Sequence, residues 1–126
     1  FKVSERLSSI FPKRVITTPI SEGAIVGISA GMAMRNMHPI VEIMFGDFIT
    51  LAADQIINGI SKFRQMYNFQ VTLPLVIRTP MGGGRGYGPT HSQCIEKLFF
   101  GLPEIKIIAP SHFHNCGDLL ERSVNP

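Results

Sequence analysis

The sequence predicts an α/β fold of three layers, α/β/α, around a mostly parallel sheet. The first observation is that the hydrophobic period switches repeatedly along the chain between helical stripes and short apolar runs, which is typical of alternating helices and strands. The second is the length of 126 residues, which fits one domain with one core. The third is a composition of 44% hydrophobic and 17% charged residues, which excludes disordered, collagen-like and coiled-coil chains.

The charges and the cysteines exclude several classes of function. The 12 Lys and Arg residues exceed the 9 Asp and Glu residues by three and are scattered, so we expect no nucleic acid partner. No apolar stretch reaches the roughly 20 residues of a membrane span, and no signal segment opens the chain. Two cysteines, Cys94 and Cys116, are too few for a disulfide framework. We therefore expect reduced thiols, no membrane contact and a cytoplasmic location, or the mitochondrial matrix in a eukaryote.

The first third of the chain predicts two helices and a strand. Ser4 is a good N-cap for a short amphipathic helix that Pro12 ends. Residues 15–17 have the composition of a short strand. Ser21 follows a proline and can cap a helix to about Asn36, whose many small residues would let another backbone approach closely, so we expect this helix to be buried.

Two strands follow in the predicted sheet. Residues 39–45 form a nearly continuous apolar run, as expected for a strand covered on both faces. Glu42 interrupts this run, and a buried, unpaired carboxylate would cost several kcal/mol. Arg78 has the equivalent place in the next strand, residues 75–79. We therefore predict that Glu42 has a structural role and pairs with Arg78.

The segment 48–67 predicts a long amphipathic helix. Its apolar residues follow a 3.6-residue period, while the polar residues fall mostly on the other side. The apolar stripe consists of Phe48, Leu51, Ala52, Ile56, Ile57, Ile60, Phe63 and Tyr67.

The last third of the chain predicts two helices and a strand. Thr90 and Gln93 have the spacing of a capping box, which favours a helix over 90–100. Residues 105–109 read as a last strand. A final helix is expected over 111–122, with Ser111 as its N-cap.

Three chemically unusual loops follow the predicted strands. They hold Ser21 and Glu22, residues 45–48, and the glycine-rich loop 81–91. Ligands of open α/β sheets bind at the carboxyl ends of the strands, so a site should lie among these loops. The glycines match neither G-x-x-x-x-G-K-[ST] nor G-x-G-x-x-G, which disfavours a phosphate site. A ligand-lining loop is favoured over a merely flexible surface loop.

Zinc is a second possibility, because histidine and cysteine recur at ligand-like spacings. These residues are His91, Cys94, His112, His114 and Cys116. The last three lie near a probable helix start, where alternate residues point to different sides, and no C-x-x-C pair is present. We predict no metal site.

Acid–base chemistry by Glu22 and His91 is a third possibility. Both residues are predicted at helix starts above the same sheet edge, where the helix dipole favours a carboxylate and a neutral imidazole. Both would then be proton acceptors. The alternative for each residue is a simple electrostatic role at a helix start.

An ordered set of short motifs runs almost from end to end of the chain. The set comprises Phe1-Lys2-Val3-Ser4, Arg14-Val15, Thr18-Pro19-Ile20-Ser21-Glu22, Met32-Ala33-Met34, Pro39-Ile40-Val41-Glu42-Ile43-Met44, Asp54-Gln55-Ile56-Ile57-Asn58 and His91-Ser92-Gln93. Together these motifs resemble the beta subunit of the thiamin-diphosphate-dependent 2-oxo acid dehydrogenases of the pyruvate and branched-chain type.

The resemblance implies that residues 1–126 are a transketolase-like pyrimidine-binding domain, incomplete at both ends. It implies oxidative decarboxylation of a 2-oxo acid with acyl transfer to lipoamide, in a heterotetramer. The implied partners are an alpha subunit that supplies the diphosphate site and magnesium, a second beta subunit and a lipoyl-bearing acyltransferase. The family's potassium site draws on the segment near Asn125 and Pro126, where the expected acidic residue is missing, so we assign none.

The resemblance also implies roles for five residues. Glu22 matches the glutamate that hydrogen-bonds the aminopyrimidine ring of thiamin diphosphate and promotes its imino tautomer. Phe48 matches the aromatic residue that stacks on the pyrimidine, and Ile20 and Met44 match apolar residues beside it. His91 matches the histidine on the substrate side, which transfers a proton or guides the lipoyl group.

Two alternatives stay open. The glycine-rich loop ends in Gly88-Pro89-Thr90-His91, which partly resembles deoxyxylulose-phosphate synthase, so a carbon–carbon ligase of that type or of the transketolase type is the first alternative. A non-catalytic interaction module is the second, because the amphipathic helix 48–67 could seal a dimer.

Overall fold

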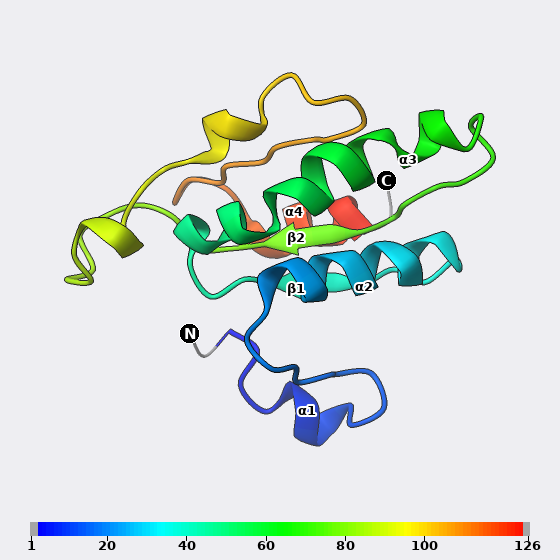
Figure 1. The fold of residues 1–126 in the computed structure, drawn as a ribbon. Helices are drawn as coiled ribbons and strands as arrows, with labels where there is room; N and C mark the ends of the chain where they lie inside the picture. Colours follow the sequence, from blue (N-terminus) through cyan, green and yellow to red (C-terminus); the bar gives the residue numbers. More distant parts are fainter. Residues whose placement is uncertain (1–2, 125–126) are drawn as a thin grey trace.

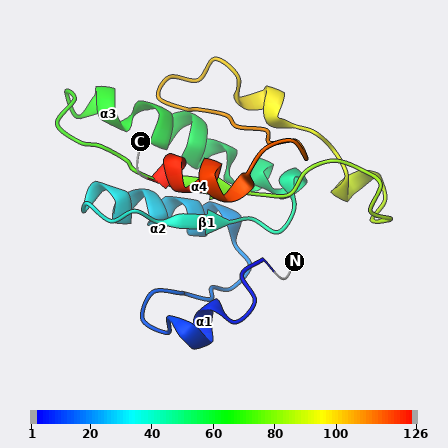
Figure 2. The same cartoon turned by 180° about the vertical axis from the view of Figure 1, so that it is seen from behind.

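The structure, a computed structural model, describes residues 3–124 and has the predicted α/β class. A parallel sheet lies between two layers of helices (Figures 1 and 2). Helix α2 (Glu22–Met34) and the helical segment 46–66 cover one face, and helix α4 (Cys116–Val124) covers the other. The predicted Phe1-Lys2 motif residues and the potassium segment at Asn125 and Pro126 lie outside the described residues.

The sheet consists of two short parallel strands, β1 (Ile40–Glu42) and β2 (Val76–Arg78). Glu42 is in register with Arg78, and the Arg78 Nη2 atom lies 2.6 Å from the Glu42 Oε2 atom, so the predicted pair is confirmed. The expectation that this strand is covered on both faces is wrong. Side chains alternate, with Val41 and Ile43 buried and Ile40 and Glu42 exposed, because α2 packs on one face of β1 whereas α4 on the other face leaves the outward side chains of β1 accessible.

The prediction of strands at residues 15–17 and 105–109 is wrong. Neither segment forms ladder hydrogen bonds within residues 3–124, and a strand is defined by those bonds. Ile16 is 70% exposed in a segment that runs outside the main body. Ile105 and Ile107 are half-buried against the core, whereas Lys106 between them is exposed. The apolar alternation of the later segment therefore reflects extended chain packed on the core without a sheet partner.

Helix α2 confirms the predicted helix but buries only one face. The buried residues recur at helical spacing and are Glu22, Val26, Ser29, Ala30 and Ala33. Ile28 and Gly31 on the other face are exposed, so the expectation of a wholly buried helix is wrong. Ser21 stands at the N-cap position, but its side chain makes no capping hydrogen bond.

The predicted helix 48–67 is helical but not uniformly α-helical. It consists of a 3₁₀ segment η1 (Gly46–Ala52), a π-helical segment η2 (Gln55–Ile60) and helix α3 (Ser61–Met66). Most of the apolar stripe faces the core, as predicted, with Leu51 and Tyr67 as exposed exceptions. The change of helical period along the segment explains why one straight 3.6-residue stripe does not fit every position.

The helix expected over 90–100 is wrong. Two short 3₁₀ turns stand there, η3 (Pro89–His91) and η4 (Glu96–Phe99). The expected capping box does not form, because the Thr90 hydroxyl contacts the His91 ring and the Gln93 amide donates to Asp47.

The two terminal helices begin later than predicted. Helix α1 covers only Leu7–Ile10, with Arg6 rather than Ser4 at its N-cap position. Helix α4 begins at Cys116, and the Asn115 Oδ1 atom accepts hydrogen bonds from the backbone N–H groups of Gly117 (3.0 Å) and Asp118 (3.4 Å). Asn115, and not Ser111, is therefore the N-cap of α4.

The core lies between the sheet, α2 and the segment 46–66. Its buried side chains are Val26, Ala30, Val41, Ile43, Ile49, Ala52, Ile56, Ile60, Ile95 and Phe99. Across residues 3–124, the helices are too short or too polar for any of them to span a bilayer.

Candidate functional site

Two of the three unusual loops meet at the carboxyl ends of the strands. The backbone N–H of Gly46 donates to the carbonyl of Pro80 at 2.9 Å, which joins the chain after β1 to the chain after β2. The Met81 side chain lies against Gly46, in the space that a side chain there would need. The predicted meeting of the loop 45–48 with the glycine-rich loop is therefore present in the fold.

Four rings gather where these loops meet and form what we call the aromatic cluster: Phe45, Phe48, Tyr87 and His91. The Phe45 ring is central, with its centroid 4.7 Å from His91, 5.3 Å from Tyr87 and 5.6 Å from Phe48. The Phe48 and His91 centroids are 5.1 Å apart. All four contacts are edge-to-face, the geometry that aromatic pairs favour. Two of the predicted site residues, Phe48 and His91, are thus brought together.

His91 is half-buried, and one of its ring nitrogens has a partner. Its Nδ1 atom lies 2.8 Å from the Thr90 hydroxyl oxygen, whereas its Nε2 atom makes no hydrogen bond within residues 3–124. His91 is the last residue of the three-residue turn η3 and does not start a helix. The helix-dipole argument for a neutral imidazole is therefore wrong here, because such a short turn has few aligned peptide dipoles.

Glu22 is the first residue of α2, and only 8% of it is exposed. Its carboxylate has no hydrogen bond or ion pair with the other residues of the described range 3–124. A Cβ atom on the next residue, Gly23, would lie only 3.3 Å from the Gln55 Oε1 atom and 3.4 Å from the Leu51 carbonyl, so the start of α2 packs closely against η1 and η2. The positive end of the helix dipole compensates part of the desolvation of a carboxylate at this position.

The other two predicted residues are accessible. Ile20 is 82% exposed in the chain before α2, and Met44 is 48% exposed because it alternates with the buried Ile43 and Phe45. Neither side chain is enclosed by residues 3–124.

Two residues that sequence reasoning did not select, Arg85 and Asp47, also belong to this region. The Arg85 Nη2 atom donates to the carbonyls of Gly82 (2.9 Å) and His91 (3.2 Å), and its guanidinium lies 5.8 Å from the centroid of Phe45. Asp47 is buried and accepts a 2.7 Å hydrogen bond from the Gln93 amide. A cation inside a glycine-rich loop, and a carboxylate between two phenylalanines, were the available signals.

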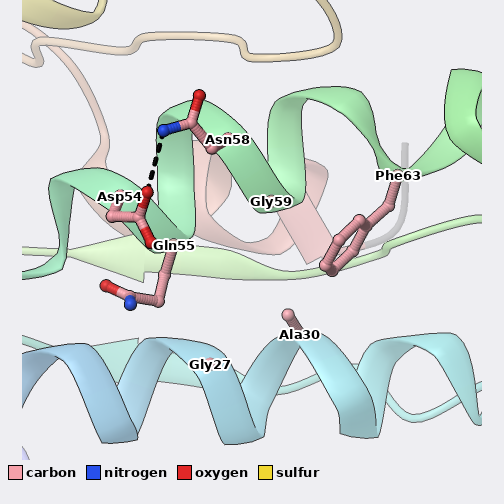
Figure 3. Close-up of a pocket in the computed structure, with 7 residues that line it drawn as sticks. All are labelled: Gly27, Ala30, Asp54, Gln55, Asn58, Gly59 and Phe63. Atoms are coloured by element: carbon pink, nitrogen blue, oxygen red, sulfur yellow. Dashed lines mark hydrogen bonds between the residues drawn. The ribbon is translucent and has the colours of Figure 1, made fainter.

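A separate open cavity of about 280 Å³ lies between α2 and η2 (Figure 3). It is lined by Gly27, Ala30, Asp54, Gln55, Asn58, Gly59 and Phe63. The Asn58 amide donates to the Asp54 carboxylate at 2.8 Å on one wall. No predicted site residue lines this cavity, so it is distinct from the region around the aromatic cluster.

The histidines and cysteines do not gather. Within residues 3–124, no three His, Cys, Asp or Glu side chains are placed to hold one metal ion. His112 stacks against Phe113 with centroids 3.9 Å apart, and the His114 Nδ1 atom accepts a hydrogen bond from the backbone N–H of Ser111 at 3.1 Å. Cys94 and Cys116 are exposed free thiols.

Comparison with known proteins assigns a family to this arrangement. The family described as the pyrimidine binding domain of transketolase matches residues 1–126. The chain is 40% identical over 125 residues to 2-oxoisovalerate dehydrogenase subunit beta of Bacillus subtilis, and 40% identical over 125 residues to the pyruvate dehydrogenase E1 component subunit beta of Porphyra purpurea. Each alignment covers 98% of this chain and 38% of the relative.

A third relative carries a different substrate in its name. The chain is 39% identical over 111 residues to the beta subunit of acetoin:2,6-dichlorophenolindophenol oxidoreductase of Cupriavidus necator, which covers 88% of this chain and 33% of the relative. The chain thus spans less than two fifths of the length of these relatives.

Proposed function

Because the chain belongs to the family of transketolase pyrimidine-binding domains, we propose that it forms the pyrimidine-binding half of a thiamin-diphosphate-dependent 2-oxo acid dehydrogenase. The observation that carries this proposal is Glu22 at the start of α2, a residue only 8% exposed whose carboxylate has no partner in the described residues. Two relatives at 40% identity are named as dehydrogenase beta subunits, which supports the choice of reaction.

The residues present fit the aminopyrimidine ring of thiamin diphosphate. A buried carboxylate without a partner can accept a hydrogen bond from a protonated ring nitrogen, and desolvation strengthens that bond. Phe48, half-buried in the aromatic cluster, offers a flat apolar surface for stacking. The exposed side chains of Ile20 and Met44 are available to cover the edges of a bound ring.

The bound cofactor supplies the nucleophilic carbon of the reaction. Glu22 holds the proton that is shared with the pyrimidine ring and thereby fixes its tautomer. Phe48 excludes water from one face of the ring. His91, whose Nε2 atom has no partner within residues 3–124, donates or accepts a proton on the substrate side or guides the lipoyl group.

The remaining parts of the site belong to other chains or domains in this proposal. An alpha subunit holds the diphosphate and magnesium, a second beta subunit completes a heterotetramer, and a lipoyl-bearing acyltransferase receives the acyl group. Two exposed, unpaired cysteines suit a reducing compartment, so we place the protein in the cytoplasm or, in a eukaryote, in the mitochondrial matrix.

The test replaces Glu22 in the full-length protein assembled with its alpha partner. Glu22→Gln keeps the shape of the side chain but cannot share the proton, so the rate of 2-oxo acid decarboxylation should decrease by about 100-fold to 10,000-fold. Glu121→Gln changes an exposed carboxylate of α4 and is the matched control, which should retain full activity. Undiminished activity of the Glu22→Gln protein would contradict the proposal.

Product analysis separates this reaction from the alternatives. With a 2-oxo acid, we expect acyl transfer to lipoamide rather than ligation to an aldehyde or cleavage of acetoin. Calorimetric titration with thiamin diphosphate and magnesium should show binding by the assembled protein, and no binding would favour a non-catalytic module.

A further inference from the structure

Asp47 is a buried carboxylate to which the proposed reaction gives no role. Only 8% of the residue is exposed, and it stands between two members of the aromatic cluster, Phe45 and Phe48. Its Oδ1 atom accepts a 2.7 Å hydrogen bond from the Gln93 Nε2 atom, while its Oδ2 atom is buried without a partner. A carboxylate this poorly solvated depends strongly on the one hydrogen bond that it does make.

That hydrogen bond joins two segments that are far apart in the sequence. Asp47 directly precedes Phe48 in η1, and Gln93 follows His91 by two residues. In the described residues, it is the sole hydrogen bond between residues 46–52 and residues 89–93. The Phe48 and His91 rings meet beside it, with centroids 5.1 Å apart.

Apart from the ring contacts with Phe45 and Phe48, the His91 segment is bonded to the rest of the chain through the glycine-rich loop. The Gly82 N–H donates to the Gln93 carbonyl at 3.3 Å, and Arg85 donates to the His91 carbonyl. This loop contains four glycines with φ between 76° and 88°, and glycine-rich backbone is easily deformed. Such a loop alone cannot fix the His91 ring relative to Phe48, whereas η1 packs on the core through Ile49 and Ala52.

We propose that Asp47 is a positioning residue, which through its hydrogen bond to Gln93 holds the His91 ring against Phe48. The catalytic consequence rests on the proposed function, since it requires that Phe48 stacks on the cofactor and that His91 faces the substrate. The position of the His91 ring does not depend on the proposed function, because it concerns only contacts inside this chain.

The positional test is an NMR measurement on the full-length assembled protein with ¹³C-labelled histidine. The His91 ring makes edge-to-face contacts with the Phe45 and Phe48 rings, so ring currents displace its signals. Gln93→Ala removes an exposed side chain without opening the core, and it should move the His91 signals toward those of His38, which is exposed and contacts no aromatic ring in the described residues. Asp47→Asn keeps an acceptor oxygen, so the His91 signals should stay near their wild-type positions. Cys94→Ala, next to Gln93 and exposed, is the control that should move nothing.

The catalytic test uses the same three variants. Gln93→Ala should lower kcat by about 10-fold to 100-fold, because a reacting group that is misplaced by about one ångström reacts that much more slowly. The dissociation constant of thiamin diphosphate should stay unchanged. The Asp47→Asn protein should retain most of the wild-type kcat, because its side chain still accepts the hydrogen bond from Gln93. Unchanged His91 signals in the Gln93→Ala protein would overturn the positioning role whatever the activity. If the wild-type assembled protein neither binds thiamin diphosphate nor turns over, the proposed function is overturned. Displaced His91 signals in the Gln93→Ala protein would still uphold the positioning role in that case.

Discussion

At the scale of single residues, Gly46 leaves room for the Met81 side chain. A Cβ atom on Gly46 would overlap the Met81 Cγ atom and would lie 3.2 Å from its sulfur. This contact holds the chain after β2 against the chain after β1, next to Phe45 of the aromatic cluster in the sequence.

Gly46→Ala should therefore lower the free energy of unfolding by about 1–3 kcal/mol, the cost of overpacking. Met81→Ala in the same protein should recover part of that loss, because it removes the overlapping atoms. Denaturant titration measures both. Gly31→Ala is the control, since nothing lies within 4 Å of a Cβ atom there, and it should be neutral or slightly stabilising.

The Glu42–Arg78 pair should contribute little to stability. The side chains are 38% and 32% exposed, and ion pairs that water reaches are worth about 0–1 kcal/mol. Glu42→Gln should change the free energy of unfolding by less than about 1 kcal/mol, and a double-mutant cycle with Arg78→Met should give a coupling of the same size. A coupling above about 3 kcal/mol would mean that another part of the whole protein buries the pair.

At the scale of elements, α4 depends on Asn115 for its start. Asn115→Ala removes the acceptor for the Gly117 and Asp118 N–H groups and should cost about 0.5–2 kcal/mol. Amide hydrogen exchange should accelerate at these two positions. Ser111→Ala is the comparison, because Ser111 bonds within its own turn to Phe113 and His114, and it should leave exchange at Gly117 and Asp118 unchanged.

The segment 46–66 illustrates what a hydrophobic pattern can predict about an element. The apolar spacing predicts a helix and its buried face, and Ala52, Ile56 and Ile60 are indeed in the core. It does not predict the π-helical period of η2, because residues spaced by four, as these are, stay near one face at an α-helical and at a π-helical period alike. The period is settled by the contacts of the segment with α2 and the sheet.

At the scale of the whole molecule, stability should come from the layer between the sheet and α2. Ile43 is 1% exposed, and Ile43→Ala should cost about 2–5 kcal/mol in denaturant unfolding of the full-length protein. Ile28→Ala on the outer face of α2, where the side chain is 64% exposed, should change stability by about 0.5 kcal/mol or less. An equal loss for Ile28→Ala would show that the whole protein covers this face.

The sequence by itself determined the α/β class, the helix α2, the apolar stripe of 46–66 and the pairing of Glu42 with Arg78. The class, the helix and the stripe follow from local periodicity. The pairing follows from a carboxylate inside an apolar strand and a cation at the equivalent place of the next strand. It also selected Glu22, Phe48 and His91, because their motifs occur in a recognisable order.

Only the tertiary structure decided which extended segments became strands, since a strand needs a neighbour to bond with and residues 15–17 and 105–109 have none in the described chain. It likewise decided that Gln93 bonds Asp47 instead of capping a helix, and that His91 ends a turn beside Phe48. These contacts join residues more than forty positions apart, and their energies depend on burial that no local pattern records.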